Sequence, residues 1–338
     1  MNIENIPLLN NKIKIEEVHK KTIEYLNNDP KKFETLRNYL WIYNSLFNLI
    51  PVPLDSLFSG HNFPISESYG ELENSYNFVF MGFYKYAFIS LRSVLELGLL
   101  SVFFNYKNED YTEIKKWLKS LDDTPFKKQI WDKIKDIKYI SDFDNKFILK
   151  ERIFKIWDEL SNYVHTKGYM FSSRYCSGSN VNNFNEKILK KWIYYVQEIV
   201  KNISIIHICR YPVGLKYLPL DEKFGLNSPF IGSLNSVQIK RIKDIIPKEE
   251  VNYLQEISDK DSGVIELLRW ANSFPDITEE EFNQQLLDFD KFLIKNQGFK
   301  NWYSQEKKTP AEDHKAKKRF NDRIKLLKKW AIENNYYK

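Results

Sequence analysis

The chain has 338 residues and a formal net charge of +6, with 51 Lys or Arg and 45 Asp or Glu. A hydrophobic share of 43% and an aromatic share of 16% are enough for a sizeable core, which excludes wholesale disorder. The two cysteines do not make a disulfide framework, and residues 1–17 have no basic stretch followed by an apolar one. We therefore expect a protein of the reducing cytoplasm.

The positive charge is concentrated in the last part of the chain. Residues 300–338 hold 12 basic and 5 acidic side chains, whereas the other 299 residues hold 39 basic and 40 acidic ones. Attraction to a polyanion is therefore expected from the C-terminal residues.

Apolar residues recur at helical spacing along the first 210 residues. The spacing predicts helices over residues 13–25, 32–49, 71–105, 111–120, 125–137, 144–166 and 186–209. No segment alternates with a period of two, so the predicted fold class is all-α.

The most apolar stretch, residues 76–104, is long enough to span a bilayer. Lys85, Arg92 and Glu96 interrupt it, so we expect the buried central helix of a soluble bundle and no membrane association.

Three of the 12 prolines and three of the 11 glycines lie between residues 211 and 232. This composition predicts a linker over residues 211–234, between an N-terminal helical bundle (1–210) and a smaller helical domain (235–338). The second domain is expected to contain helices over residues 237–245, 249–257, 264–272, 279–295 and 310–333. Thr309, Pro310 and Glu312 form a capping-box start for the last of these.

Lys85, Arg92 and Glu96 fall within about 40° of one another on the apolar helix. Charges embedded in an apolar surface must be paired, and they often mark a site. Arg92 and Glu96 stand four residues apart, so two interpretations stay open, a structural ion pair and a binding or catalytic site.

The helix over residues 144–166 has two distinct faces. Its expected core-facing residues are Ile153, Ile156, Trp157, Leu160 and Val164, and Asp158, Asn162 and His165 lie on the opposite side. That polar face is either solvated, or it lines a groove or dimer cleft where His165 acts as general acid or base. In the second case Asp158 and Asn162 would orient His165 or a substrate. Gly168 is expected to cap the helix.

The sequences SLRSVLE at residues 90–96 and LSNYVHTKG at residues 160–168 resemble motifs of the HEPN superfamily, over residues 71–209. The resemblance implies a helical bundle, a homodimer and a metal-independent ribonuclease without a cofactor, active in phage defence or toxin–antitoxin systems. We therefore expect Arg92, Glu96 and His165 to be catalytic, and Lys85, Asp158 and Asn162 of the two polar faces to bind the substrate.

One position departs from the family pattern. The family places an arginine about five residues before the histidine, and here that residue is Leu160. Arg152 is 13 residues away and about 140° around the helix from His165, so Arg92 from a neighbouring helix is the candidate replacement. The alternative function is a non-catalytic interaction or sensing module.

No phosphate-binding glycine loop, HExxH or GxSxG motif is present, and His207 and Cys209 are expected in the core.

The last helix has Phe320, Ile324, Leu327 and Ala331 on one side and Lys315, Lys317, Lys318, Arg319 and Lys325 among its basic residues. It could follow the phosphates of RNA, dock on an acidic protein partner, or simply be solvated.

Overall fold

The structure is a computed structural model that describes residues 12–52, 58–106, 111–177, 183–225, 232–307 and 314–337. All regular structure in these residues is helical, so the all-α fold class is confirmed. The chain divides into two compact units, one formed by Met1–Leu218 with Ser228–Arg269 and the other by Pro219–Asn227 with Trp270–Lys338.

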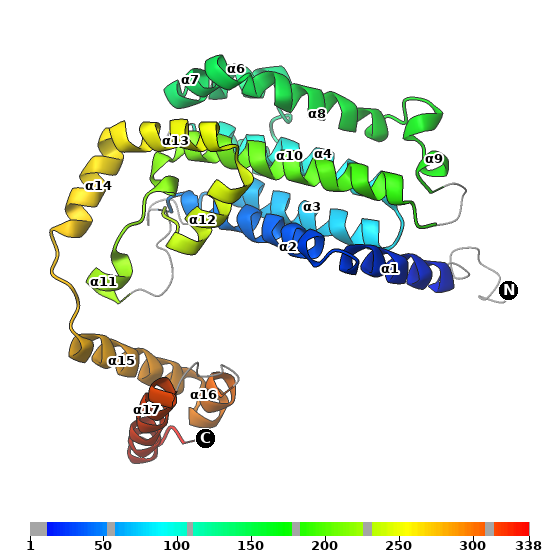
Figure 1. Cartoon of the computed structure of the whole chain (residues 1–338). Coiled ribbons are helices and arrows are strands. Elements are labelled where there is room, and N and C mark those ends of the chain that lie inside the picture. Colours follow the sequence, from blue (N-terminus) through cyan, green and yellow to red (C-terminus); the bar gives the residue numbers. More distant parts are fainter. Residues whose placement is uncertain are drawn as a thin grey trace. The chain divides into compact units, whose positions relative to one another are not determined.

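The first unit contains most of the helices (Figure 1). They are α1 (Lys12–Asn27), α2 (Pro30–Ser45), α3 (Phe63–Phe80), α4 (Tyr84–Phe104), α5 (Thr112–Leu118), α6 (Lys127–Ile134), α7 (Lys138–Phe147), α8 (Leu149–Val164), α9 (Ser173–Ser177), α10 (Glu186–Arg210), α12 (Ser236–Ile245), α13 (Lys248–Lys260) and most of α14 (Ser262–Asn272).

Helix α4 is the centre of this unit. It packs against α3, α6, α8 and α10, and α10 in turn packs against α2, α7 and α8. In Figure 1 the long helices form layers, with α6 to α8 on one side of α4 and α10, and α1 to α3 on the other. Fourteen of the 21 residues of α4 are buried, which explains its high apolar content.

Two of the expected helices are each divided in two. The chain reverses at Gly82, which has φ +78°, so the expected helix 71–105 is α3 followed by α4. Ile148 adopts a left-handed conformation with φ +49° and separates α7 from α8 inside the expected helix 144–166. The Asp144 carboxylate accepts a hydrogen bond from the Lys150 N–H at 2.7 Å and so satisfies the start of α8.

The two breaks leave different traces in the sequence. A glycine inside an apolar run is a weak signal for a left-handed residue, whereas an isoleucine gives no such signal.

The division into units differs from the expected one. Helices α12 and α13, expected in the C-terminal domain, belong to the first unit, because Ile239, Ile242, Val251 and Leu254 are buried in the large core. A bidentate pair joins α13 to α8, with Arg152 Nη1 and Nη2 donating to Glu250 at 2.7 and 3.3 Å. The glycine- and proline-rich stretch therefore does not mark the end of the first unit.

The second unit contains α11 (Leu220–Phe224), α15 (Glu279–Gln297), α16 (Phe299–Glu306), α17 (His314–Glu333) and the end of α14. Its small core consists of Ile294, Phe299, Trp302, Leu327 and Ala331. Arg323 ties α17 to the other helices through ion pairs with Asp290 and Glu306 at 3.3 and 2.7 Å. Helix α16 was not expected, and the predicted capping box at 309–312 lies outside the described residues.

Among the described residues, α4 is the helix long and apolar enough to cross a membrane. However, 72% of its most apolar window is buried inside the first unit, which is typical of the core helix of a soluble protein.

Candidate functional site

Helices α4 and α8 lie antiparallel, and side chains of the polar stripe cross from one to the other. Lys85 Nζ donates to Thr166 Oγ1 at 2.6 Å, and Arg92 Nε donates to Ser161 Oγ at 3.1 Å. The start of α4 therefore meets the end of α8. We call this line of contact the α4–α8 seam, made by Lys85, Arg92 and Glu96 on α4 and by Trp157, Ser161 and Thr166 on the α8 side.

Arg92 occupies the middle of the seam. Its Nη1 donates to Glu96 Oε2 at 3.1 Å, and its guanidinium carbon lies 3.3 Å from the centre of the Trp157 ring. The Arg92 side chain is 14% exposed and that of Glu96 is 30% exposed. The ion pair considered from the sequence is thus present, at the edge of the core.

The surroundings of Arg92 shift the pKa of its guanidinium in opposite directions. Burial lowers the pKa of the guanidinium from its ordinary value, while the carboxylates of Glu96 and Asp158 act to raise it. An arginine keeps its proton under such conditions. Among the described residues, Nη2 of Arg92 has no hydrogen-bond partner, so one edge of the guanidinium remains open to a further acceptor.

His165 lies at the end of the seam, directly after the last residue of α8. Its backbone N–H donates to the Ser161 carbonyl oxygen at 3.0 Å, and its side chain is exposed. The imidazole forms no hydrogen bond or ion pair with any residue that the structure describes. His165 is therefore accessible to a ligand from solvent.

The backbone beyond His165 turns sharply. Thr166 has φ +47° and Gly168 has φ +81°. A β-branched residue in the left-handed region costs about 1–2 kcal/mol, and such strain is common at functional sites. The hydroxyl of Thr166 accepts the hydrogen bond from Lys85, so this strained turn holds a cation next to the histidine.

The expected orienting residues behave differently from one another. The Asp158 carboxylate forms an ion pair with Lys127 of α6, so it does not make the expected contact with His165. Asn162 is half-buried and stands one turn before His165. Its backbone carbonyl oxygen accepts a hydrogen bond from the Lys167 N–H at 2.9 Å. Val164, expected in the core, is 42% exposed, and Tyr163 is buried in its place.

His207 and Cys209 lie in the core, as expected. His207 is fully buried between the Ile203 carbonyl oxygen and Ser101 Oγ, at 2.9 and 3.3 Å, and burial lowers its pKa to about 4. No group of three or more His, Cys, Asp or Glu able to hold a metal ion occurs in the part of the chain that the structure describes.

On α17, Leu327 and Ala331 face the small core as the spacing predicted, and Lys325 is exposed. The side chains of Lys315, Lys317, Lys318 and Arg319 fall outside what the structure describes.

Sequence reasoning missed the partners of Arg92 across the seam. Trp157 was expected in the core, and Ser161 gave no signal of its own. The i,i+4 spacing of Trp157 and Ser161 puts them on one face of α8, but only the packing shows that this face meets α4.

Comparison of this chain with models of protein families, with curated proteins and with solved structures gives no match.

Proposed function

We propose that this protein is a metal-independent ribonuclease of the HEPN type, with His165 as the group that transfers a proton. The observation that carries the proposal is the reach of Arg92 across the seam to Ser161, four residues before His165. The family pattern requires an arginine about five residues before the histidine, and in this chain that position holds the buried Leu160. Arg92 brings a guanidinium to the same stretch of α8 from a neighbouring helix.

The arrangement suits the chemistry of RNA cleavage without a metal. The nucleophile is the 2′-hydroxyl of the nucleotide, which attacks the adjacent phosphorus while the bond to the 5′-oxygen breaks. A proton must leave the first oxygen and another must reach the second, and an exposed imidazole can carry either transfer. Lys85 and the open Nη2 edge of Arg92 would balance the negative charge that builds up on the phosphate. Asn162 would hydrogen-bond the substrate, and Glu96 would position Arg92.

The proposal includes a second copy of the chain and a reducing cytoplasmic location. Tyr86 and Val164 are 51% and 42% exposed, and they stand next to Lys85 and His165 in the sequence. A second copy would bury these two side chains next to the site. Cys176 and Cys209 are free thiols, as is usual in the cytoplasm.

A second RNA contact is proposed on α17. Lys325, Lys328 and Lys329 lie along this helix. The side chains of Lys325 and Lys329 are 80% and 78% exposed, and their ion pairs with Asp322 and Glu333 are long, at 4.0 and 3.9 Å. Exposed lysines on one helix can follow a phosphate backbone.

The alternative is a non-catalytic interaction or sensing module that binds a protein partner. The observation in its favour is that Arg92 contacts Glu96, Ser161 and the Trp157 ring, and these three contacts would hold α4 against α8 without any ligand. In that case Arg92 and Glu96 only hold α4 against α8.

The test is cleavage of end-labelled RNA in the presence of EDTA. The wild-type chain should give products with cyclic 2′,3′-phosphate and 5′-hydroxyl ends. It should leave RNA with 2′-O-methyl groups intact, because the nucleophile is blocked. His165→Ala should lower the rate by about 10²–10⁴-fold, the usual contribution of a proton-transferring side chain.

The matched control is His19→Ala on α1, which removes a histidine elsewhere in the same unit. Equal loss of activity in both variants would contradict the role of His165. If the wild-type chain cleaves no RNA in EDTA over a panel of single-stranded and structured substrates, the ribonuclease proposal is wrong and the interaction module replaces it.

A further inference from the structure

The chain around His165 carries a local excess of positive charge that the overall balance conceals. Residues 160–191 contain five Lys or Arg and one acidic residue, Glu186. Glu186 is paired with Lys190 at 2.6 Å, so both charges are compensated. Lys167, Arg174, Lys187 and Lys191 remain, although the chain outside residues 300–338 is almost neutral.

These cations gather at one end of the first unit, with Lys85 among them. Lys85 bonds to Thr166, and Lys191 on α10 lies 5.6 Å from the centre of the Tyr163 ring. Burial raises the pKa of the Cys176 thiol to about 11, and the positive charges of Lys191 and Lys85 both lower it, so both lysines lie near this thiol.

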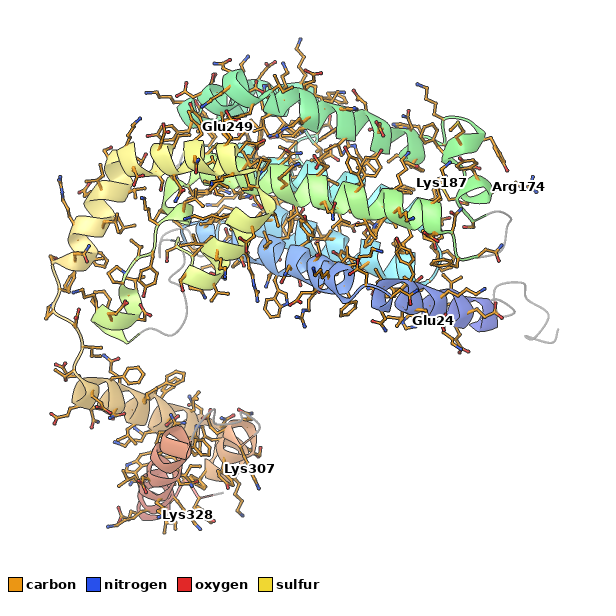
Figure 2. The ribbon with its side chains drawn as sticks, in the orientation of Figure 1. Glu24, Arg174, Lys187, Glu249, Lys307 and Lys328 are labelled. Atoms are coloured by element: carbon orange, nitrogen blue, oxygen red, sulfur yellow. The ribbon has the colours of Figure 1, made fainter. Side chains whose placement is uncertain are left out.

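Hydrogen bonds fix the elements that carry these cations. Asn185 Nδ2 donates to the Cys176 carbonyl oxygen at 3.1 Å, which joins α9 to the start of α10. Figure 2 shows Arg174 and Lys187 at this same end.

An exposed aromatic ring belongs to the same segment, two residues after Lys167. Tyr169 follows the turn at Gly168 and is 63% exposed. Its ring meets the Tyr175 ring edge to face, with centroids 5.7 Å apart, so one neighbour supports it and the rest is open. Two residues on, Phe171 packs against the buried Tyr163 at 5.0 Å and anchors the segment.

The combination selects one chemical class of ligand. Lys167, Arg174 and Lys187 form no ion pair with any described residue, so their charges are available to a polyanion. An open aromatic ring between cations provides a stacking surface for a base, and only an unpaired strand offers its bases for stacking. A duplex would satisfy the cations but not the ring.

We propose that Lys85, Lys167, Tyr169, Arg174, Lys187 and Lys191 form a binding platform for a single-stranded nucleic acid. The cations hold the phosphates, and Tyr169 stacks on one base. One part of this inference rests on the proposed function. If the protein is a ribonuclease, the bound strand is RNA and the platform leads it to His165.

The experiment measures fluorescence anisotropy of labelled 20-nucleotide strands over a range of salt concentrations, and 2′-O-methyl groups make the RNA strands resistant to cleavage. Arg174→Ala combined with Lys187→Ala should weaken binding about tenfold. It should also lower the slope of log affinity against log salt by about 1.4, since each phosphate contact on a single strand contributes about 0.7. Tyr169→Ala should weaken binding about tenfold with the slope unchanged, and Tyr169→Phe should restore it, because stacking needs the ring and not the hydroxyl.

Matched controls use exposed residues elsewhere in the first unit. Lys115→Ala combined with Lys116→Ala removes the same charge from α5, and Phe126→Ala removes a ring that is 78% exposed. Both controls should bind like the wild type. Unchanged binding in the platform variants, or equal losses in the controls, would overturn the platform.

Three further arms decide the nature of the ligand. Single-stranded DNA should also bind, and duplex RNA should bind more weakly than a single strand. Poly-glutamate should compete poorly. Equal binding of the duplex, or efficient competition by poly-glutamate, would show a general polyanion surface and contradict the proposal.

Failure of the platform and failure of the ribonuclease are distinguishable. Binding that depends on Tyr169 and Arg174 without any cleavage of unmodified RNA would keep the platform and remove the enzyme. Cleavage that depends on His165 but not on Tyr169, Arg174 or Lys187 would keep the enzyme and remove the platform.

Discussion

The middle and the end of the α4–α8 seam use the same kinds of side chain in opposite ways. In the middle, Arg92 is 14% exposed and is held by Glu96, Ser161 and the Trp157 ring. At the end, His165 is exposed, and Lys85 is held by a single hydrogen bond to a strained turn. The middle is therefore held by several contacts, whereas the end is open to solvent.

This difference shows why an embedded charge is an ambiguous functional signal. Three partners offset the free-energy cost of removing Arg92 from water. A buried arginine needs such partners for the fold to be stable, whether or not it also has a function. His165 has no comparable protein partner among the described residues. A ligand can therefore approach it without breaking the packing of the fold.

The largest loss of stability is expected for Arg92→Ala. The substitution removes the ion pair, the hydrogen bond to Ser161 and the contact with Trp157, so the free energy of unfolding should fall by about 2–4 kcal/mol. Differential scanning calorimetry would show it as a lower transition temperature of the first unit. A loss below about 0.5 kcal/mol would contradict a stabilising role for the middle of the seam.

A smaller loss is expected for Glu96→Ala. A buried pair that loses one partner costs about 3–5 kcal/mol, but Glu96 is 30% exposed and Arg92 keeps Ser161 and Trp157, so about 1–2 kcal/mol is expected. The double variant Arg92→Met with Glu96→Leu should recover most of the loss, because no charge is then left without a partner. If the double variant is less stable than Glu96→Ala, the loss does not come from a charge left without a partner, and this explanation is wrong.

A gain in stability is expected for Ile148→Gly, away from the seam. Ile148 is 59% exposed with φ +49°, so glycine relieves the left-handed strain, and a gain of about 0.5–1 kcal/mol should remain after the added chain entropy. Thr166→Gly relieves the same kind of strain but removes the hydroxyl bonded to Lys85, so its gain should be smaller. Equal gains at both positions, measured by calorimetry, would show that the Lys85 contact adds nothing.

The smallest effect on stability is expected for His165→Ala. An exposed side chain without a described partner should change the free energy of unfolding by at most about 0.5 kcal/mol. The loss of activity predicted for the same variant would then be chemical and not structural. A loss of stability comparable to that of Arg92→Ala would show that His165 also stabilises the fold, and the contrast between the middle and the end of the seam would be wrong.

Most helices could be predicted from the sequence, because their spacing of apolar residues reflects burial on one face. The break at Gly82 left only a weak signal and the break at Ile148 left none, since a left-handed residue depends on how the flanking helices pack. For the site, the i,i+4 spacing identified the Arg92–Glu96 pair. The contact of Asp158 with Lys127 and that of Arg92 with Ser161 are long-range, and no local pattern encodes them.

The sequence by itself determined the all-α class, the central apolar helix with its charged stripe, and the position of His165 near a helix end. These features follow from periodicity and capping, which act over a few residues. Only the tertiary structure decided which residues meet across the seam, which helices share a core, and that Lys85, Arg174 and Lys187 come together at one end. The reason is physical: contacts between residues distant in the chain depend on the packing of whole helices, and this packing brings α4, α8, α9 and α10 to a common end.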